Sequence, residues 1–185
     1  MTGFEETPWL LPVLGVGVLV VAVIVWRRFF GRGNALERAL ADISYERIEN
    51  LVIPGADEGE ILVDQLLLTS QGLLILETKD VQGAVFGGDK MSDWTVIAQD
   101  RRYTFRNPQP ALYDRIAAVR QIVRQVPVNG RVLFLDGAEF TKGVPSLVCD
   151  LDQLVRDFGE PDKDAARFKI EAFKPHWEII VNRAG

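Results

Sequence analysis

Two apolar segments joined by a short turn constrain the fold of this chain more than any other feature. Residues 61–69 and 73–79 are rich in Leu, Ile and Val, and Ser70, Gln71 and Gly72 lie between them. Branched aliphatic residues favour strands, and glycine supplies the backbone freedom that a tight turn needs. The pattern therefore predicts a β-hairpin in which the two segments pair.

This hairpin carries two acids and a lysine. Side chains alternate between the faces of a strand, so Glu77 and Lys79 share one face and Thr78 points to the other. Folding the chain about the turn brings Asp64 across from residues 77–79. Two neighbouring carboxylates suit Mg²⁺, and a lysine beside them can orient a water and stabilise charge on a phosphate. The arrangement predicts metal-dependent phosphodiester hydrolysis; the alternative is a sheet edge protected by charges.

An apolar run near the N-terminus sets the first part of the chain apart. Residues 9–26 contain no charge and would span about 27 Å as a helix, close to the thickness of a bilayer core. Two glutamates precede the run and three arginines follow it, at positions 27, 28 and 32. Arginine-rich flanks stay on the cytoplasmic side. We therefore expect an uncleaved single-pass anchor in the cell membrane, with the N-terminus outside and the main domain in the cytoplasm.

The rest of the chain predicts an α/β (α+β) domain, a mixed sheet flanked by helices. Leu36, Leu40 and Ile43 have helical spacing after Asn34, a candidate helix cap. Further expected elements are strands at 81–86, 94–98, 102–105, 131–135 and 145–149 and helices at 111–125 and 151–158. The remainder is ambiguous, and we expect a charged helix at 162–173 and then a final strand or a membrane-proximal tail at 177–181. The expected segments are an outer N-terminus (1–8), the transmembrane helix (9–26), a basic stretch (27–32), the main domain (33–158) and a C-terminal extension or final helix and strand (159–185).

The charge of the chain argues against a general grip on nucleic acid. Of its 21 basic and 26 acidic residues, three arginines and two glutamates precede residue 33, so the remainder has a net charge of −6. Nucleic-acid-binding domains usually carry a basic footprint. Residues 101–131, however, hold seven arginines and one aspartate. Arg106, Arg120 and Arg124 are the candidates for contacts with nucleic acid, and a solvated helix face is the alternative.

Several other kinds of site are disfavoured. His176 is the single histidine and is interpreted as a surface or packing residue, and neither a Ser-His-Asp triad nor a histidine-rich metal site can be built around a second one. The sequence has no phosphate-loop motif. Cys149 lies in an apolar setting that favours a buried structural thiol. Trp94 could stack on a base, but a core position is favoured.

The order of landmarks along the middle of the chain resembles the nuclease-related domain family, NERD, a relative of the restriction-endonuclease-like PD-(D/E)xK fold. The landmarks are, in order, Asp64, Gly72, Glu77, Lys79, Gly83, Val85, Gly87, Trp94, Asn107 and Pro108. The resemblance implies a restriction-endonuclease-like sheet and a nucleic-acid substrate. It also implies Mg²⁺ or Mn²⁺ held by Asp64 and Glu77, with Lys79 as the third catalytic residue.

The sequence also departs from the family pattern. Family members usually have a glutamate after the glycine that opens the first helix, whereas Gly33 is followed here by Asn34, and Glu37 is a candidate substitute as a metal ligand. Gln65 stands where a histidine is common, and Gln109 comes too early for the expected glutamine. Two interpretations therefore remain: a membrane-anchored nuclease, or a catalytically weakened or inactive membrane-tethered module that binds or scaffolds. The pattern does not indicate an oligomeric state.

Overall fold

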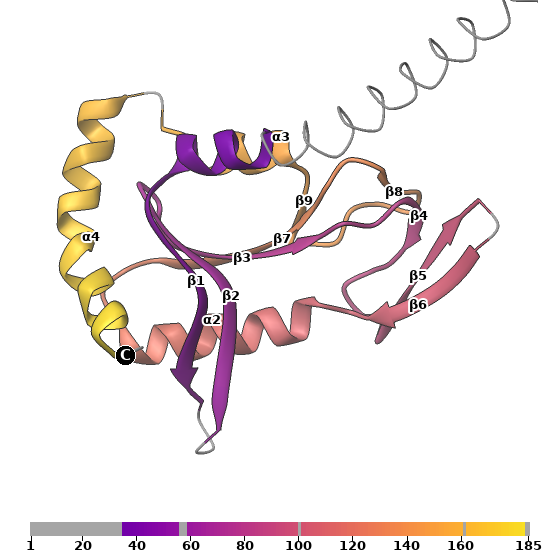
Figure 1. The fold of residues 1–185 in the computed structure, drawn as a ribbon, viewed down its shortest axis with the longest axis horizontal. Coiled ribbons are helices and arrows are strands. Elements are labelled where there is room, and N and C mark those ends of the chain that lie inside the picture. The colour runs from indigo at the N-terminus through magenta and orange to yellow at the C-terminus, as the bar shows by residue number, and fades with distance from the viewer. Residues whose placement is uncertain (1–34, 56–58, 100, 161, 184–185) are drawn as a thin grey trace, which may run out of the picture. The chain divides into compact units, whose positions relative to one another are not determined.

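The computed structural model describes residues 35–55, 59–99, 101–160 and 162–183 (Figure 1). The chain divides into two compact units, residues 1–38 and 39–185. The predicted transmembrane helix at 9–26 and the basic stretch at 27–32 lie outside the described residues. Within the described part, no helix is long and apolar enough to cross a membrane.

A five-stranded mixed sheet forms the centre of the unit of residues 39–185. Its strands are, in spatial order, β1 (Ser44–Pro54), β2 (Glu60–Thr69), β3 (Gly72–Lys79), β7 (Val128–Phe134) and β9 (Val148–Cys149). The pairs β1–β2 and β2–β3 are antiparallel, whereas β3–β7 and β7–β9 are parallel. The predicted hairpin is thus confirmed as β2 and β3.

The turn between β2 and β3 depends on its threonine and glycine. The Thr69 hydroxyl donates to the Gly72 carbonyl at 2.8 Å and accepts from the Gln71 amide at 3.1 Å. Gly72 has a φ of 108°, and a Cβ there would collide with the carbonyl oxygen of Pro127. Glycine is therefore required at this position both by the backbone conformation and by the close approach of the neighbouring chain.

A second, four-stranded sheet lies beyond the end of the first. Its order is β6 (Arg101–Arg106), β5 (Asp93–Ala98), β4 (Gly83–Phe86) and β8 (Ala138–Phe140). The antiparallel β4–β5–β6 meander was predicted, whereas the parallel strand β8 was not. Trp94 is fully buried against the rings of Phe105, Phe134 and Phe140. It is a core residue and is not available for stacking on a base.

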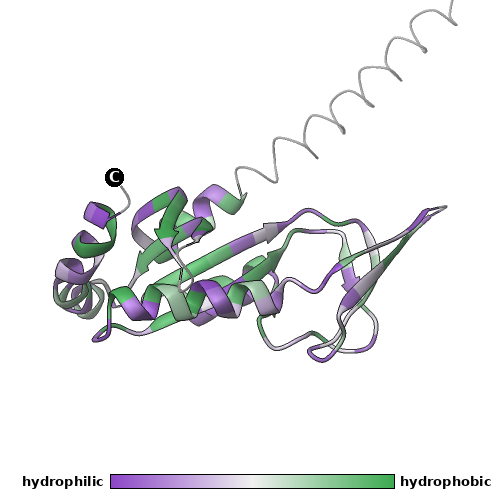
Figure 2. Cartoon of the chain, turned by 90° about the horizontal axis from the view of Figure 1, so that it is seen from below, coloured by the Kyte–Doolittle hydropathy of each residue, from purple (hydrophilic) through white to green (hydrophobic). Residues whose placement is uncertain are grey.

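Helices cover both faces of the five-stranded sheet. Residues 35–43 are helical, and the other helices are α2 (Gln109–Ile122), α3 (Leu151–Phe158) and α4 (Lys163–Arg183). Figure 1 shows α2 on one side of the sheet and α3 on the other. In Figure 2, hydrophobic colour runs along the central strands and hydrophilic colour recurs along the helices. The described fold is therefore mixed α/β, with two mixed sheets and four helices.

One face of α2 is buried against the five-stranded sheet. Leu112, Ile116 and Val119 are buried, and Gly130 of β7 lies directly beneath them, where a Cβ would collide with the first two side chains. The glycine thus allows α2 to pack closely on the sheet. Asp150 caps α3, since its carboxylate accepts from the Gln153 amide at 2.7 Å.

The C-terminal region corrects the expectation from the sequence. The strand expected at residues 177–181 is helical and belongs to α4, which continues through Pro175. Ala166, Ile170, Trp177 and Ile180 are buried. Their spacings of four, seven and three residues place them on one helical face, and burial of that face holds the segment as one helix.

Candidate active site

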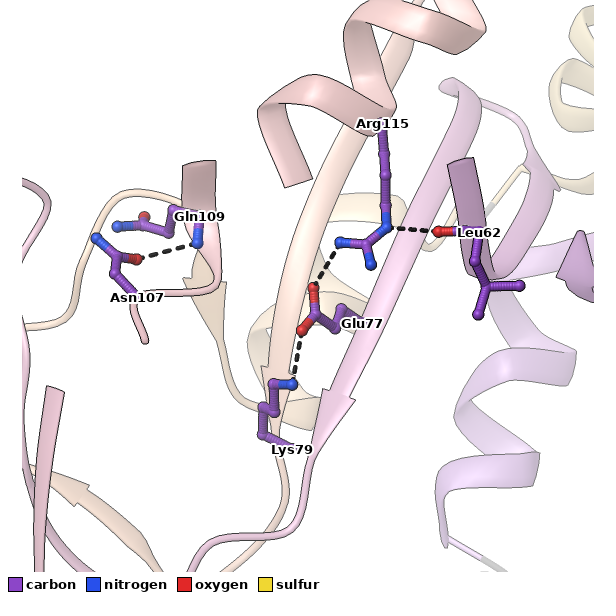
Figure 3. Close-up of polar contacts among 6 residues, drawn as sticks. All are labelled: Leu62, Glu77, Lys79, Asn107, Gln109 and Arg115. Carbon is purple, nitrogen blue, oxygen red and sulfur yellow. Dashed lines mark hydrogen bonds and ion pairs between the residues drawn. The ribbon is translucent and has the colours of Figure 1, made fainter. Parts of the chain in front are cut away.

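Glu77 lies at the centre of a charged cluster near the end of β3. Its Oε1 is 2.6 Å from Nζ of Lys79, and its Oε2 is 3.3 Å from Nη1 of Arg115 (Figure 3). The Glu77 side chain is 9% exposed, whereas that of Lys79 is 34% exposed. The alternation of side chains along β3 places Glu77 and Lys79 on the same face, as expected. Each carboxylate oxygen of Glu77 therefore already has a cationic partner.

Arg115 enters this cluster from the middle of α2. Its Nε donates to the Leu62 carbonyl of β2 at 2.7 Å, and its Nη1 donates to Glu77. One side chain thus joins α2, β2 and β3. Arg115 was not among the site residues predicted from the sequence. A signal was present, because Arg115 directly precedes Ile116 and so borders the buried stripe of its helix.

Asp64 lies on the strand next to Glu77. The pairing of β2 with β3 runs to Gln65 opposite Leu76, and the next residues along the two strands are Asp64 and Glu77. Asp64 is half-buried, and its carboxylate has no hydrogen bond or ion pair within the described part of the chain. Its carboxylate remains available to a ligand, in contrast to that of Glu77.

Asp64 and Glu77 suit a divalent cation once Glu77 has released one of its ion-pair partners. Mg²⁺ often keeps several waters and uses one or two protein carboxylates, so Asp64 and Glu77 supply a suitable donor set. Glu77 becomes available only in exchange for an existing ion pair. Among the residues that the structure describes, no group of three His, Cys, Asp or Glu side chains is placed to hold a metal. Glu37 is an exposed helical residue in the unit of residues 1–38, separate from the unit that carries the two strand acids.

The three candidate arginines for nucleic acid do not form a single patch. Arg106 is exposed at the end of β6, before α2 begins, and Arg124 is exposed after α2 ends. Arg120, in the last turn of α2, donates from Nη2 to the Val128 carbonyl at 2.7 Å and ties the helix to β7. The length of α2 separates Arg106 from Arg120 by roughly 20 Å.

A second polar network surrounds the start of α2. Asn107 Oδ1 accepts from the Gln109 amide at 3.0 Å, and Gln109 Oε1 accepts from the Leu147 amide at 2.9 Å. Asp89 Oδ1 accepts from the Ser146 amide at 2.8 Å and from Gln109 Nε2 at 3.1 Å. These two hydrogen bonds, the one from Ser146 foremost, hold the pKa of Asp89 below its ordinary value. Sequence reasoning missed this network, whose partners are distant in the sequence.

A cavity of about 330 Å³ lies at the carboxyl ends of β7 and β9. Phe134, Phe140, Val144 and Cys149 are among its lining residues, and the three predicted catalytic residues are not. Burial, foremost among the causes, raises the pKa of the Cys149 thiol to about 12. The thiol is therefore protonated at neutral pH, which agrees with the predicted structural role.

Comparison with known proteins identifies the family. An uncharacterized protein of Bacillus anthracis is 24% identical over 82 residues, which make up 44% of this chain and 39% of that protein. The match thus spans well under half the length of this relative, and no solved structure matches the chain. Residues 29–135, more than half of the chain, match the nuclease-related domain, NERD. This segment contains Asp64, Glu77, Lys79 and Arg115, and the chain belongs to the nuclease-related domain family.

Proposed function

We propose that this protein is a membrane-anchored nuclease that hydrolyses phosphodiester bonds of DNA or RNA with the help of Mg²⁺ or Mn²⁺. One observation carries the proposal: Glu77 and Lys79 share a face at the end of β3, and Asp64 lies on the paired strand β2, one residue beyond the pair formed by Gln65 and Leu76. Family membership implies a nuclease-related function. We further propose that the sheet from β1 to β7, with α2 packed on it, is a restriction-endonuclease-like core.

Each residue of the cluster has a proposed role. Asp64 and Glu77 hold the cation. When bound, the cation polarises the phosphate and lowers the pKa of a water. Lys79 is partly exposed beside Glu77, and its ammonium would donate a hydrogen bond to the attacking water or to a phosphate oxygen and stabilise the developing negative charge.

Substrate contacts are proposed for three of the seven arginines in residues 101–131. Arg106, Arg120 and Arg124 would meet phosphates along an extended nucleic acid, because they lie at the two ends of α2. Such contacts would offset locally the net charge of −6 of residues 33–185. Arg120 would need its remaining guanidinium donors for this, since Nη2 already binds the Val128 carbonyl.

The proposed location is the inner face of the cell membrane. The uncharged run at residues 9–26 and the arginines that follow it support a single-pass anchor with the N-terminus outside. This topology would hold the nuclease domain in the cytoplasm, close to nucleic acid that enters or lies near the envelope.

A specific observation favours a second candidate function, a catalytically weakened or inactive tethered module that binds or scaffolds. Both oxygens of Glu77 already contact cations, and Asn34 replaces the acid that the family usually has in its first helix. A carboxylate that is neutralised in this way is a poorer metal ligand, since the cation must displace an existing partner.

The two candidates are separated by a cleavage assay on the full-length chain in mild detergent. Single- and double-stranded DNA and RNA are incubated with Mg²⁺, Mn²⁺ or EDTA. We expect metal-dependent cleavage that falls on the order of a hundredfold or more in Asp64→Ala and Lys79→Ala, the usual range for removing a group that stabilises the transition state. Asp114→Ala and Lys90→Ala, which alter exposed residues of the same types, are the matched controls.

Two results would favour the second candidate. The first is cleavage that survives both Asp64→Ala and Lys79→Ala, because it would come from a contaminant or from another site. The second is a lack of cleavage of every substrate with either metal by a chain that melts cooperatively.

A further inference from the structure

The ion pairs of Glu77 create a conflict with its proposed role as a metal ligand. The side chains of Arg115 and Glu77 are 19% and 9% exposed, so water screens their attraction much less than at an open surface. Lys79, at the end of its strand, is more exposed and can turn toward solvent. Arg115 is therefore the partner whose hold on Glu77 matters most for a competing cation.

We infer that Arg115 is a built-in competitor of the divalent metal, which occupies Glu77 Oε2 in the metal-free protein and must release it before that oxygen becomes a ligand. This inference rests on the proposed function, because it concerns the same site. Two cations cannot share one carboxylate oxygen closely without mutual repulsion. The metal affinity of the native chain is consequently lower than its two carboxylates alone would provide.

The anchoring of Arg115 makes this exchange possible without movement of α2. Its Nε donates to the Leu62 carbonyl at 2.7 Å independently of the contact between Nη1 and Glu77. A rotation at the end of the side chain breaks the second contact and preserves the first. Leu62 is two residues from Asp64 on β2, so the released guanidinium stays beside the site, where an anion such as a phosphate can bind it.

Mn²⁺ binding to the full-length chain in detergent tests the inference, with affinity measured by calorimetry and by the spin-resonance signal of free Mn²⁺. Arg115→Gln and Arg115→Ala remove the competing charge. We expect Mn²⁺ to bind roughly tenfold to a hundredfold more tightly, the gain expected when a charged hydrogen bond no longer has to be broken. Arg115→Lys keeps a positive charge and is expected to gain less.

Arg131→Ala is the matched control. Arg131 also donates to a backbone carbonyl, that of Gly130, and also pairs with a carboxylate, but that carboxylate is Asp157 and not Glu77. We expect it to leave the Mn²⁺ affinity unchanged. Circular dichroism and thermal melts establish that each variant is folded, and Arg115→Gln, which retains a side-chain donor for Leu62, replaces Arg115→Ala should the latter unfold.

The outcomes separate this inference from the proposed function. Equal or weaker Mn²⁺ binding by folded Arg115→Gln overturns the inference, and cleavage by the native chain would leave the proposed nuclease intact. Tighter Mn²⁺ binding by Arg115→Gln, with no cleavage by the native chain, supports the competition by Arg115 and overturns the proposed nuclease function. If no variant binds Mn²⁺, the inference is wrong, and the cleavage assay alone decides the fate of the proposed function.

Discussion

Two polar clusters lie along α2, and they differ in the kind of groups they contain. The Asn107 network, at the start of the helix, consists of amides, backbone groups and Asp89, whereas the Glu77 cluster, at its middle, consists of formal charges (Figure 3). The central residues of both are buried, since Asn107 and Gln109 are 3% and 2% exposed and Glu77, counted as a whole residue, is 7% exposed. Burial alone does not distinguish a structural cluster from a functional one.

The two clusters differ in how fully their polar side-chain atoms are paired within the protein. Both polar atoms of the Asn107 side chain and both of the Gln109 side chain have partners within the protein. Such a network has little to offer a ligand, and its effect is to fix the start of α2 against neighbouring loops. The Glu77 cluster has exchangeable cations and, beside it, Asp64 without a described partner. Its arrangement suits binding more than stability.

Glu77→Gln should produce the largest effect, and it should appear in activity. The substitution keeps the shape of the side chain but removes the charge that the cation and Lys79 need. We expect cleavage to fall on the order of a hundredfold or more. The free energy of unfolding should fall by only about 1 kcal/mol, because Lys79 can reach solvent and Arg115 keeps its bond to Leu62. Parallel cleavage assays and urea titrations measure both quantities, and unfolding of the variant in buffer would show that the cluster is primarily structural.

Asn107→Ala should show the opposite pattern. Its side chain donates to the Met91 carbonyl at 2.9 Å and accepts from the Gln109 amide, so its loss leaves buried groups unpaired. We expect the free energy of unfolding to fall by about 2 kcal/mol, with cleavage per folded molecule retained. Urea titration and the cleavage assay again provide the measurements. Gln121→Ala, on the exposed side of α2, is the control and should change the free energy of unfolding by less than about 0.5 kcal/mol. If Asn107→Ala loses cleavage but not stability, the two clusters do not differ in the way described.

The sequence was sufficient for features that depend on neighbouring residues. The β2–β3 hairpin follows from two apolar runs and a glycine turn, and the shared face of Glu77 and Lys79 follows from strand alternation. Arg115 is 38 residues from Glu77 along the chain, so their contact depends on how α2 packs across the sheet. The same holds for Gln109, whose partner Leu147 is 38 residues away. No local pattern contains that information.

The C-terminal helix shows a different limit. Residues 177–181 are apolar apart from Glu178 and follow Pro175, and such a short segment suits a buried strand as well as a helix. Packing of Ile170, Trp177 and Ile180 with the main hydrophobic core settles the choice in favour of α4. Tertiary contacts thus override an ambiguous local pattern, at the cost of a proline within the helix.

Asp89→Asn should produce the smallest effect, a change in how stability depends on pH under acidic conditions. Hydrogen bonds from the Ser146 amide and the Gln109 side chain hold the pKa of Asp89 in the folded chain below its ordinary value of 3.8. The ionised carboxylate therefore stabilises the fold above pH 3.8, and this contribution is lost as the pH falls through the lowered pKa. Asp89→Asn has no charge to titrate. The stability difference between the two chains, from urea titrations between about pH 5 and pH 2, should therefore shrink toward low pH. Glu160, whose pKa is also lowered, is present in both chains and cancels. If the stability difference between the two chains does not change with pH, the Asn107 network holds Asp89 equally well in either protonation state. The contrast between this network and the charge-dependent Glu77 cluster would then rest on burial and hydrogen-bond geometry alone.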